Sequence, residues 1–265
     1  MRYAAVLIWA LMAPYGAAAL PGEVVASAKS ADLVIAGEVH DNPSHHAAQA
    51  DLVAAVQPAA IVFEMLSAEQ AARITPELLA DAVALEAALG WAESGWPDFS
   101  MYYPIFIASD AAIYGAAVPR DAARAAMSAG VVAAFGAEAG LYGLDAALAA
   151  PEQALREAMQ MAAHCDAMPP EMLPAMVDIQ RLRDARLAQA ALQALRERGG
   201  PVVMITGNGH ARKDWGAAAY AAKAAPEVVV FALGQGEDGR APEGDFDAVL
   251  DAAAPERQDP CLAFQ

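Results

Sequence analysis

The chain has few positive charges for its size. Its 265 residues include 16 lysines and arginines against 33 aspartates and glutamates, which gives a net charge of −17. A chain this acidic has no electrostatic attraction to the phosphates of nucleic acid or to an anionic membrane surface. The acidic residues are dispersed and form no tail, so they favour solubility and predict no nucleic-acid partner.

Long apolar runs are also scarce. The first, Val6–Met12, is followed by Pro14 and is too short to span a bilayer, which needs about 20 residues. With Arg2 before it and three alanines after it, residues 1–19 have the layout of a cleaved secretory signal. No cysteine lies near the cleavage point, so we expect no lipid anchor. Residues 20–265 are then expected to form one domain, periplasmic or secreted, with no stable membrane insertion.

Several short catalytic motifs are absent. The sequence contains no GxSxG nucleophile elbow, no HExxH zinc motif, no CxxCH haem-attachment motif and no GxxxxGK[ST] phosphate loop. These absences count against serine hydrolases, zincin metalloproteases, c-type cytochromes and P-loop proteins. Cysteine is rare as well: Cys165 and Cys261 are the two in the chain. In an exported protein they form either a disulfide or a buried pair of free thiols.

What the sequence does contain is a succession of short apolar runs separated by helical segments. A buried strand is predicted at residues 32–36, and further strands at 60–64, 113–118, 202–206 and 228–233, with a short last strand at 246–250. This alternation predicts an α/β fold, a mainly parallel β-sheet core flanked by helices. A helical lobe is expected to be inserted around residues 65–165.

Helix boundaries follow from capping residues and prolines. Ser44 is a candidate N-cap for a helix over residues 45–56. The segment 75–89 reads as one helix that ends at Gly90. A further helix is expected over 104–112.

Polar side chains follow three of the predicted strands. Glu38 and His40 come after the first strand, Glu64 ends the second, and His210 follows the fourth through a GNG turn that begins at Gly207. Ligands of open parallel sheets bind outside the carboxyl ends of the strands, so we expect these side chains to form one site. Two carboxylates and two imidazoles can act as general acid and base or hold a divalent metal. The alternative is a hydrogen-bonded structural network.

The long helix predicted over 169–198 carries a second polar pattern. Gln180, Arg183 and Asp184 have i, i+3, i+4 spacing, so they share one face. If this face is buried, its arginine needs a carboxylate. The candidates are Asp184, Asp121, Glu38 and Glu64. If the face is exposed, it is simply solvated.

Other aromatic and imidazole side chains are candidate haem ligands. Tyr102 and Tyr103 lie in an aromatic segment that forms either a core plug or a ligand platform, and tyrosinate is a known ligand of ferric haem. His164 is another candidate, with a satisfied core or surface histidine as its alternative. His45 and His46 are adjacent in the first turn of a helix, so we expect one of them to point away from the sheet.

Together these segments resemble a known family. The segments that carry the resemblance, in chain order, are GEVHDNPSHHAAQ, IVFEM, LGWAESGWPDFSMYYPIF, QRLRDARLA and VVMITGNGHAR. They are similar to the ChaN-like haem-binding uptake proteins of the Tiki superfamily, which also includes erythromycin-esterase-like and TraB-like proteins. The superfamily site, a Glu-x-His, a strand-end Glu and a GxxH, falls here on Glu38, His40, Glu64, Gly207 and His210.

The resemblance implies an extracytoplasmic protein that binds haem in iron uptake, in some members as a homodimer. In this hypothesis the iron ligand is Tyr102, Tyr103 or His164, and His45 or His46 lies near the propionates. A local cation such as Arg120 or Arg212 is then needed, because the chain is acidic. The alternative is a metal-assisted or acid–base hydrolase that uses Glu38, His40, Glu64 and His210, so whether the chain is an enzyme stays open.

Overall fold

The structure is a computed structural model of the chain, and it describes residues 20–259, 261 and 262. The predicted secretory signal, residues 1–19, lies outside the described residues. Within the described part, no helix combines the length and the apolar character that crossing a bilayer requires.

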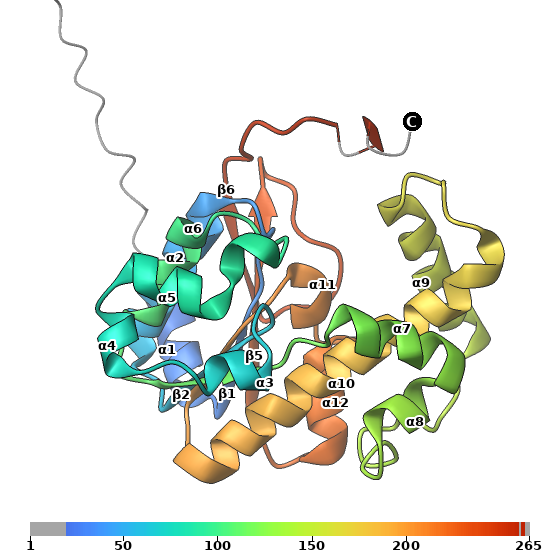
Figure 1. Cartoon of the computed structure of the whole chain (residues 1–265), viewed down its shortest axis with the longest axis horizontal. Coiled ribbons are helices and arrows are strands. Elements are labelled where there is room, and N and C mark those ends of the chain that lie inside the picture. Colours follow the sequence, from blue (N-terminus) through green and yellow to red (C-terminus); the bar gives the residue numbers. More distant parts are fainter. Residues whose placement is uncertain (1–19, 260, 263–265) are drawn as a thin grey trace, which may run out of the picture.

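One parallel sheet of six strands forms the centre of the described chain (Figure 1). The strands are β1 (Leu33–Ala36), β2 (Ala60–Phe63), β3 (Ala112–Gly115), β4 (Val202–Ile205), β5 (Val230–Glu237) and β6 (Ala248–Ala252). Their order across the sheet is β3-β2-β4-β1-β5-β6, so β4 lies between β2 and β1. All residues of β1, β2 and β4 are buried, as expected for parallel strands covered on both faces. The predicted α/β fold is thereby confirmed.

Helices cover both faces of the sheet (Figure 1). The first face packs against α1 (Gly22–Ser30), α2 (Pro43–Val56), α5 (Ala82–Leu89) and α6 (Phe99–Phe106). The second face packs against α7 (Arg120–Ala129), α8 (Val131–Phe135), α10 (Leu173–Arg198) and α12 (Ala217–Ala224). Successive side chains of a strand point to opposite faces of the sheet, so each strand contributes to a hydrophobic core on both faces. Val34 of β1 packs against the first layer of helices and Ile35 against the second.

The segment around residues 65–165 does not form a single lobe. Its short helices α3 (Ala68–Ala71) and α4 (Pro76–Leu79) lead into the first layer, whereas α7 and α8 belong to the second. The edge strand β3 separates these two parts. The last helix of the segment, α9 (Ala150–Ala163), packs on α10.

Capping explains two helix boundaries that differ from expectation. Asn42, rather than Ser44, is the N-cap of α2, because its side chain accepts a hydrogen bond from the backbone N–H of Ser44. The segment 75–89 is two helices, because the carboxylate of Asp81 caps α5 and so interrupts the helix that α4 begins.

Other elements begin or end elsewhere than predicted. Asp98 caps α6, which therefore begins at Phe99 and contains Pro104 near its end rather than at its start. Helices α1 and α12, the short α11 (Asn208–Ala211) and the 3₁₀ turn η1 (Trp91–Glu93) were not predicted. The long helix is preceded by a separate 3₁₀ turn, η2 (Pro170–Met172), so α10 itself begins at Leu173.

The C-terminal segment, defined as residues 253–259 with 261 and 262, is fixed at two points. Cys165 and Cys261 form a disulfide, which ties this segment to the turn after α9. Closer to β6, the Arg257 guanidinium binds the carboxylates of Asp41 and Glu237. The segment therefore runs from the carboxyl end of the sheet towards α9 (Figure 1).

The end of β3 provides a test of this packing. A Cβ atom at Gly115 would lie 2.2 Å from the backbone carbonyl oxygen of Ser67, so backbone would have to move. Gly115→Ala is expected to lower the free energy of unfolding by about 1–3 kcal/mol, measured by urea denaturation. The matched control is Gly22→Ala, where a Cβ atom meets nothing within 4 Å. Equal midpoints for the two variants would contradict this packing.

Candidate functional site at the carboxyl end of the sheet

The carboxyl ends of β1, β4 and β2 meet because these strands are neighbours. Their last residues are in register, with Ile205 of β4 opposite both Ala36 and Phe63. The residues that follow are therefore brought to one place, although they are far apart in the sequence. The structure brings together the four side chains expected there, Glu38, His40, Glu64 and His210.

Glu64 connects β2 to the end of β4. Its Oε2 accepts a hydrogen bond from the Thr206 hydroxyl at 2.6 Å and another from the Gly207 N–H at 2.9 Å. Burial opposes ionisation of this carboxyl, but nearby His210 and His40 and the two hydrogen bonds lower its pKa to about 2. Glu64 is therefore a carboxylate at neutral pH.

His210 lies between two carboxylates. Its Nδ1 is 2.6 Å from Asp184 Oδ1, and its Nε2 is 3.6 Å from Glu64 Oε1. Burial lowers the pKa of an imidazole, but the charges of Glu64 and Asp184 outweigh it and raise the His210 pKa to about 9. Burial raises the pKa of Asp184, which the bond to His210 opposes. The arrangement stabilises a buried imidazolium.

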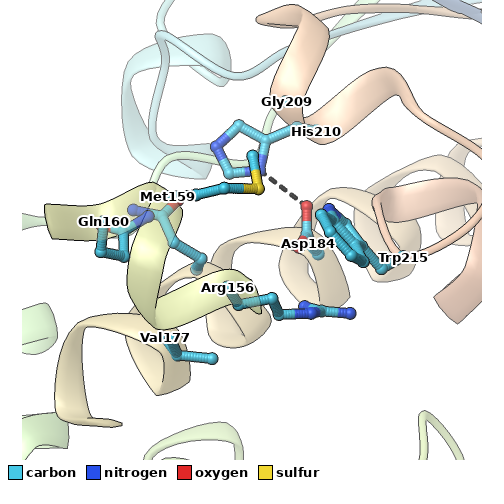
Figure 2. Close-up of a pocket in the computed structure, with 9 residues that line it drawn as sticks. Arg156, Met159, Gln160, Val177, Asp184, Gly209, His210 and Trp215 are labelled. Carbon is cyan, nitrogen blue, oxygen red and sulfur yellow. Dashed lines mark hydrogen bonds and ion pairs between the residues drawn. The ribbon is translucent and has the colours of Figure 1, made fainter. Parts of the chain in front are cut away.

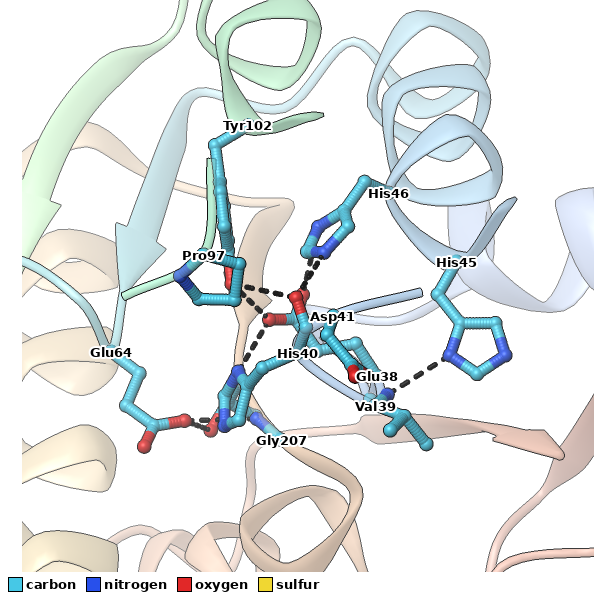
Figure 3. A network of polar contacts seen from close by, with 12 residues as sticks. Glu38, Val39, His40, Asp41, His45, His46, Glu64, Pro97, Tyr102 and Gly207 are labelled. Atoms are coloured by element: carbon cyan, nitrogen blue, oxygen red, sulfur yellow. Dashed lines mark hydrogen bonds and ion pairs between the residues drawn. The ribbon is translucent and has the colours of Figure 1, made fainter. Parts of the chain in front are cut away.

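Glu38 is the centre of a second network (Figure 3). Its Oε1 accepts hydrogen bonds from the Tyr102 hydroxyl at 2.8 Å and from His40 Nδ1 at 2.7 Å. Burial, together with the charge of Glu38, raises the pKa of Tyr102 far above its usual range, so the phenol stays protonated and donates. The hydroxyl of Tyr102, on α6, thereby anchors the loop that follows β1.

His46 lies on the other side of Glu38. Its Oε2 faces His46 Nδ1 at 3.4 Å, and neither atom has a hydrogen-bond partner among the described residues. His46 Nε2 already donates to the backbone carbonyl of His40 at 2.8 Å. His46 therefore packs against Glu38 and, through the His40 carbonyl, helps to hold the loop after β1.

His40 is the most solvent-exposed member of the four, with 33% of its side chain accessible. Its ring packs against that of Trp96, with centroids 4.9 Å apart. Burial lowers its pKa, but the hydrogen bond to Glu38 and the charge of Glu64 produce a net rise. A Cβ atom at Gly207 would lie 2.9 Å from His40 Nε2, so the glycine permits this close approach.

The expectation that His45 or His46 points away from the sheet is wrong, because both are buried. His45 Nδ1 accepts from the Val39 N–H at 2.9 Å, and its Nε2 donates to the Gly236 carbonyl at 3.1 Å. Burial lowers its pKa. The cause is the length of β5, which continues to Glu237 and places a carbonyl over the first turn of α2.

The polar face of α10 has a different partner from the one expected. Asp184 is buried and pairs with His210 rather than with an arginine. Arg183 is half-buried and close enough to His210 for its charge to oppose protonation of that ring. The buried arginine of this helix is Arg181, which binds Asp178 and backbone carbonyls.

The remaining expected residues lie apart from these networks. The Tyr103 hydroxyl donates to the Leu79 carbonyl, on the α4 side of α6. His164 caps the end of α9, and its Nδ1 bonds the Gln160 carbonyl at 2.7 Å.

Neither expected cation belongs to the networks either. Arg120 is exposed at the start of α7, near Gly95, and Asp121 beside it is also exposed. Arg212 is buried and bound to the Asp214 carboxylate through two of its nitrogens.

A cavity of about 100 Å³ beside His210 was not anticipated (Figure 2). Its lining residues are Arg156, Met159, Gln160, Val177, Gln180, Asp184, Gly209, His210 and Trp215. Only the i, i+3, i+4 spacing of Arg156, Met159 and Gln160 on α9 offered a signal in the sequence. Among the described residues, no group of three or more His, Cys, Asp or Glu side chains is placed to hold a metal ion, so the expected divalent metal is not supported.

Comparisons with known proteins show the family and the fold of the chain. The model of the family described as haem-binding uptake, Tiki superfamily, ChaN, matches residues 24–220. The chain belongs to the ChaN family. A solved structure described as cofacial heme binding to ChaN of Campylobacter jejuni has a TM-score of 0.66 and 19% identity, covering 86% of this chain and 89% of that one. At this identity the likeness establishes a shared fold.

A second solved structure, the type III effector HopBA1, matches with a TM-score of 0.45 and 15% identity, over 88% of this chain and 92% of its own. That score is too low to define a common fold. No curated protein matches the sequence significantly.

The bond between Tyr102 and Glu38 can be tested by removing one hydroxyl. Tyr102→Phe leaves a buried carboxylate with one donor fewer and is expected to lower the free energy of unfolding by about 1–3 kcal/mol. Tyr103→Phe is the matched control, since its hydroxyl bonds a carbonyl outside the network and its loss should cost less. Urea denaturation measures both. A larger loss in Tyr103→Phe would argue against the network.

The His210 imidazolium predicts a pH dependence. Its pKa is raised from 6.5 to about 9, so its contribution to stability is fully present below pH 6.5 and is lost as the pH rises through about 9. At about 1.4 kcal/mol per pKa unit, the effect is at most on the order of 3 kcal/mol. Urea midpoints of the native protein should fall across this window, whereas those of His210→Gln should fall less. Parallel curves would exclude a charged His210.

Proposed function

We propose that this chain binds haem and takes part in haem uptake outside the cytoplasm. The match of the ChaN family model to residues 24–220 is the observation that carries the proposal. The similar Campylobacter structure, which has the same fold, is described as ChaN with haem bound. The secretory layout of residues 1–19 supports placement outside the cytoplasm.

His164 is the residue we assign to the haem iron. Its Nδ1 donates to the Gln160 carbonyl at 2.7 Å. Histidines that bind metals typically donate their other ring N–H to a carbonyl or carboxylate in this way. The disulfide at Cys165 fixes the turn that carries this ring.

The other candidate side chains are held by contacts within the fold. Tyr102 is fully buried, and its hydroxyl binds Glu38. Both ring nitrogens of His45 are bonded to backbone atoms. His46 is buried against Glu38, and the Tyr103 hydroxyl bonds a carbonyl of α4.

The hydrolase alternative has less support. Glu38, Glu64 and His210 are largely buried, and their hydrogen bonds join strand ends. Such a network stabilises the carboxyl edge of the sheet without any turnover. His40 alone among the four has appreciable exposure, which is a narrow basis for acid–base catalysis.

A haemin titration of the purified protein tests the proposal. The protein is expected to give a saturable shift of the Soret band with an imidazole-type spectrum. His164→Ala should lose that spectrum and weaken binding at least tenfold, because the iron loses its protein ligand. Tyr103→Phe, on the opposite side of the sheet from α9, should retain both.

Two results would count against this assignment. No saturable shift with the native protein would overturn haem binding. An unchanged spectrum in folded His164→Ala would leave haem binding intact and remove His164 as the ligand.

A further inference from the structure

We propose that the disulfide between Cys165 and Cys261 is a redox-sensitive switch that holds the C-terminal segment on the loop after β1. Reduction by a dithiol opens the disulfide, releases the segment and loosens the loop that carries His40. The inference rests on the contacts of the segment and is independent of haem binding. Figure 1 shows the segment leaving β6 at the carboxyl end of the sheet and running towards α9.

Arg257 joins the segment to the carboxyl end of the sheet. Its guanidinium donates two hydrogen bonds to the Asp41 carboxylate, both at 2.7 Å, and two to the Glu237 carboxylate, at 2.6 and 2.7 Å. Asp41 follows His40 directly in the loop after β1, and Glu237 is the last residue of β5. One guanidinium therefore connects the segment, the loop and the sheet.

Asn42 adds a second contact between the loop and the segment. Its side-chain amide donates to the backbone carbonyl of Ala253 at 3.0 Å and to the Glu237 carboxylate at 2.7 Å. The same side chain caps α2 by accepting a hydrogen bond from the Ser44 N–H. The C-terminal segment thus holds the loop after β1 at two residues that follow His40.

These contacts alone hold the segment weakly. None of residues 253–259 is buried, so the segment contributes no side chain to either hydrophobic core. The side chains of Arg257 and Asp41 remain 31% and 47% exposed, and ion pairs this exposed to water contribute little. A segment with few buried contacts opens readily unless it is tethered. The disulfide supplies that tether.

The disulfide lies where a reductant can reach it. Cys165 and Cys261 are half-buried, and their neighbours Asp166 and Leu262 are exposed. Cys165 and Asp166 also have positive φ angles, 55° and 57°, in the left-handed region that residues with a side chain rarely adopt. This backbone strain favours opening of the disulfide, because the released turn can relax.

The reaction is a thiol–disulfide exchange. A thiolate of the dithiol attacks one sulfur of the disulfide, and the other sulfur leaves as a thiolate that takes up a proton. The second thiol of the reductant then breaks the mixed disulfide, so the chain gains two thiols and the reductant becomes a disulfide. Since the chain has two cysteines in all, no rearranged disulfide can form within it.

The experiment compares two redox forms of the full-length protein. One is purified without reductant; the other is reduced with dithiothreitol, alkylated with iodoacetamide and freed of both reagents. Trypsin cleavage after Arg257 reports release of the segment, because the guanidinium must leave its carboxylates to enter the protease. Amide hydrogen exchange reports on the loop, residues 38–42, with β4 as the internal reference.

Three variants accompany the two forms. Cys261→Ser is permanently open, and Arg257→Gln removes the ion pairs while keeping the disulfide. Arg124→Gln, at an exposed arginine of α7, is the matched control for Arg257→Gln.

Reduction should accelerate cleavage after Arg257 about tenfold or more and exchange in the loop about threefold or more, with β4 unchanged. Cys261→Ser should show both increases without treatment and no further change after it. Arg257→Gln should raise exchange in the loop with the disulfide intact, whereas Arg124→Gln should match the native protein.

Four results would overturn the switch. Free thiols in the protein purified without reductant would mean that the disulfide does not form. Equal cleavage rates in the two forms would mean that it does not hold the segment. Faster cleavage with unchanged exchange in the loop would remove control of the loop. A parallel rise in β4 would make the disulfide a stabiliser of the whole fold.

Discussion

The hydrogen bonds from Thr206 and Gly207 to the Glu64 carboxylate are the interaction on which the rest of the site depends. They join the end of β2 to the end of β4, the strand inserted between β2 and β1. The turn that follows β4 is thereby held in place, and with it His210. Without this connection, His210 would have no fixed carboxylate opposite Asp184.

Two charged networks lie at this edge of the sheet. The first contains Glu64, His210 and Asp184, and joins β2, α11 and α10. The second is centred on Glu38 and joins the loop after β1 to α2 and α6. Buried charges are unfavourable unless they are paired, and in both networks imidazole rings lie against carboxylates.

Much of this arrangement was predictable from the sequence. Short apolar runs that end in Glu38, Glu64 or the turn before His210 predict a parallel sheet with a polar carboxyl edge, because parallel strands end on the same side. The bond from Tyr102 to Glu38 was not predictable, because it joins residues 64 positions apart on two elements. The burial of Arg156 was hidden for another reason: α9 has few apolar side chains other than alanine, so the sequence does not show which of its faces is buried.

The central claim is that His210 is an imidazolium held between two carboxylates, and nitrogen-15 NMR of its ring tests this directly. At pH 7.5 the account predicts that both ring nitrogens carry protons and that they titrate near pH 9, a signal absent from His210→Gln. A neutral ring at pH 7.5, with one bare nitrogen, would contradict the account.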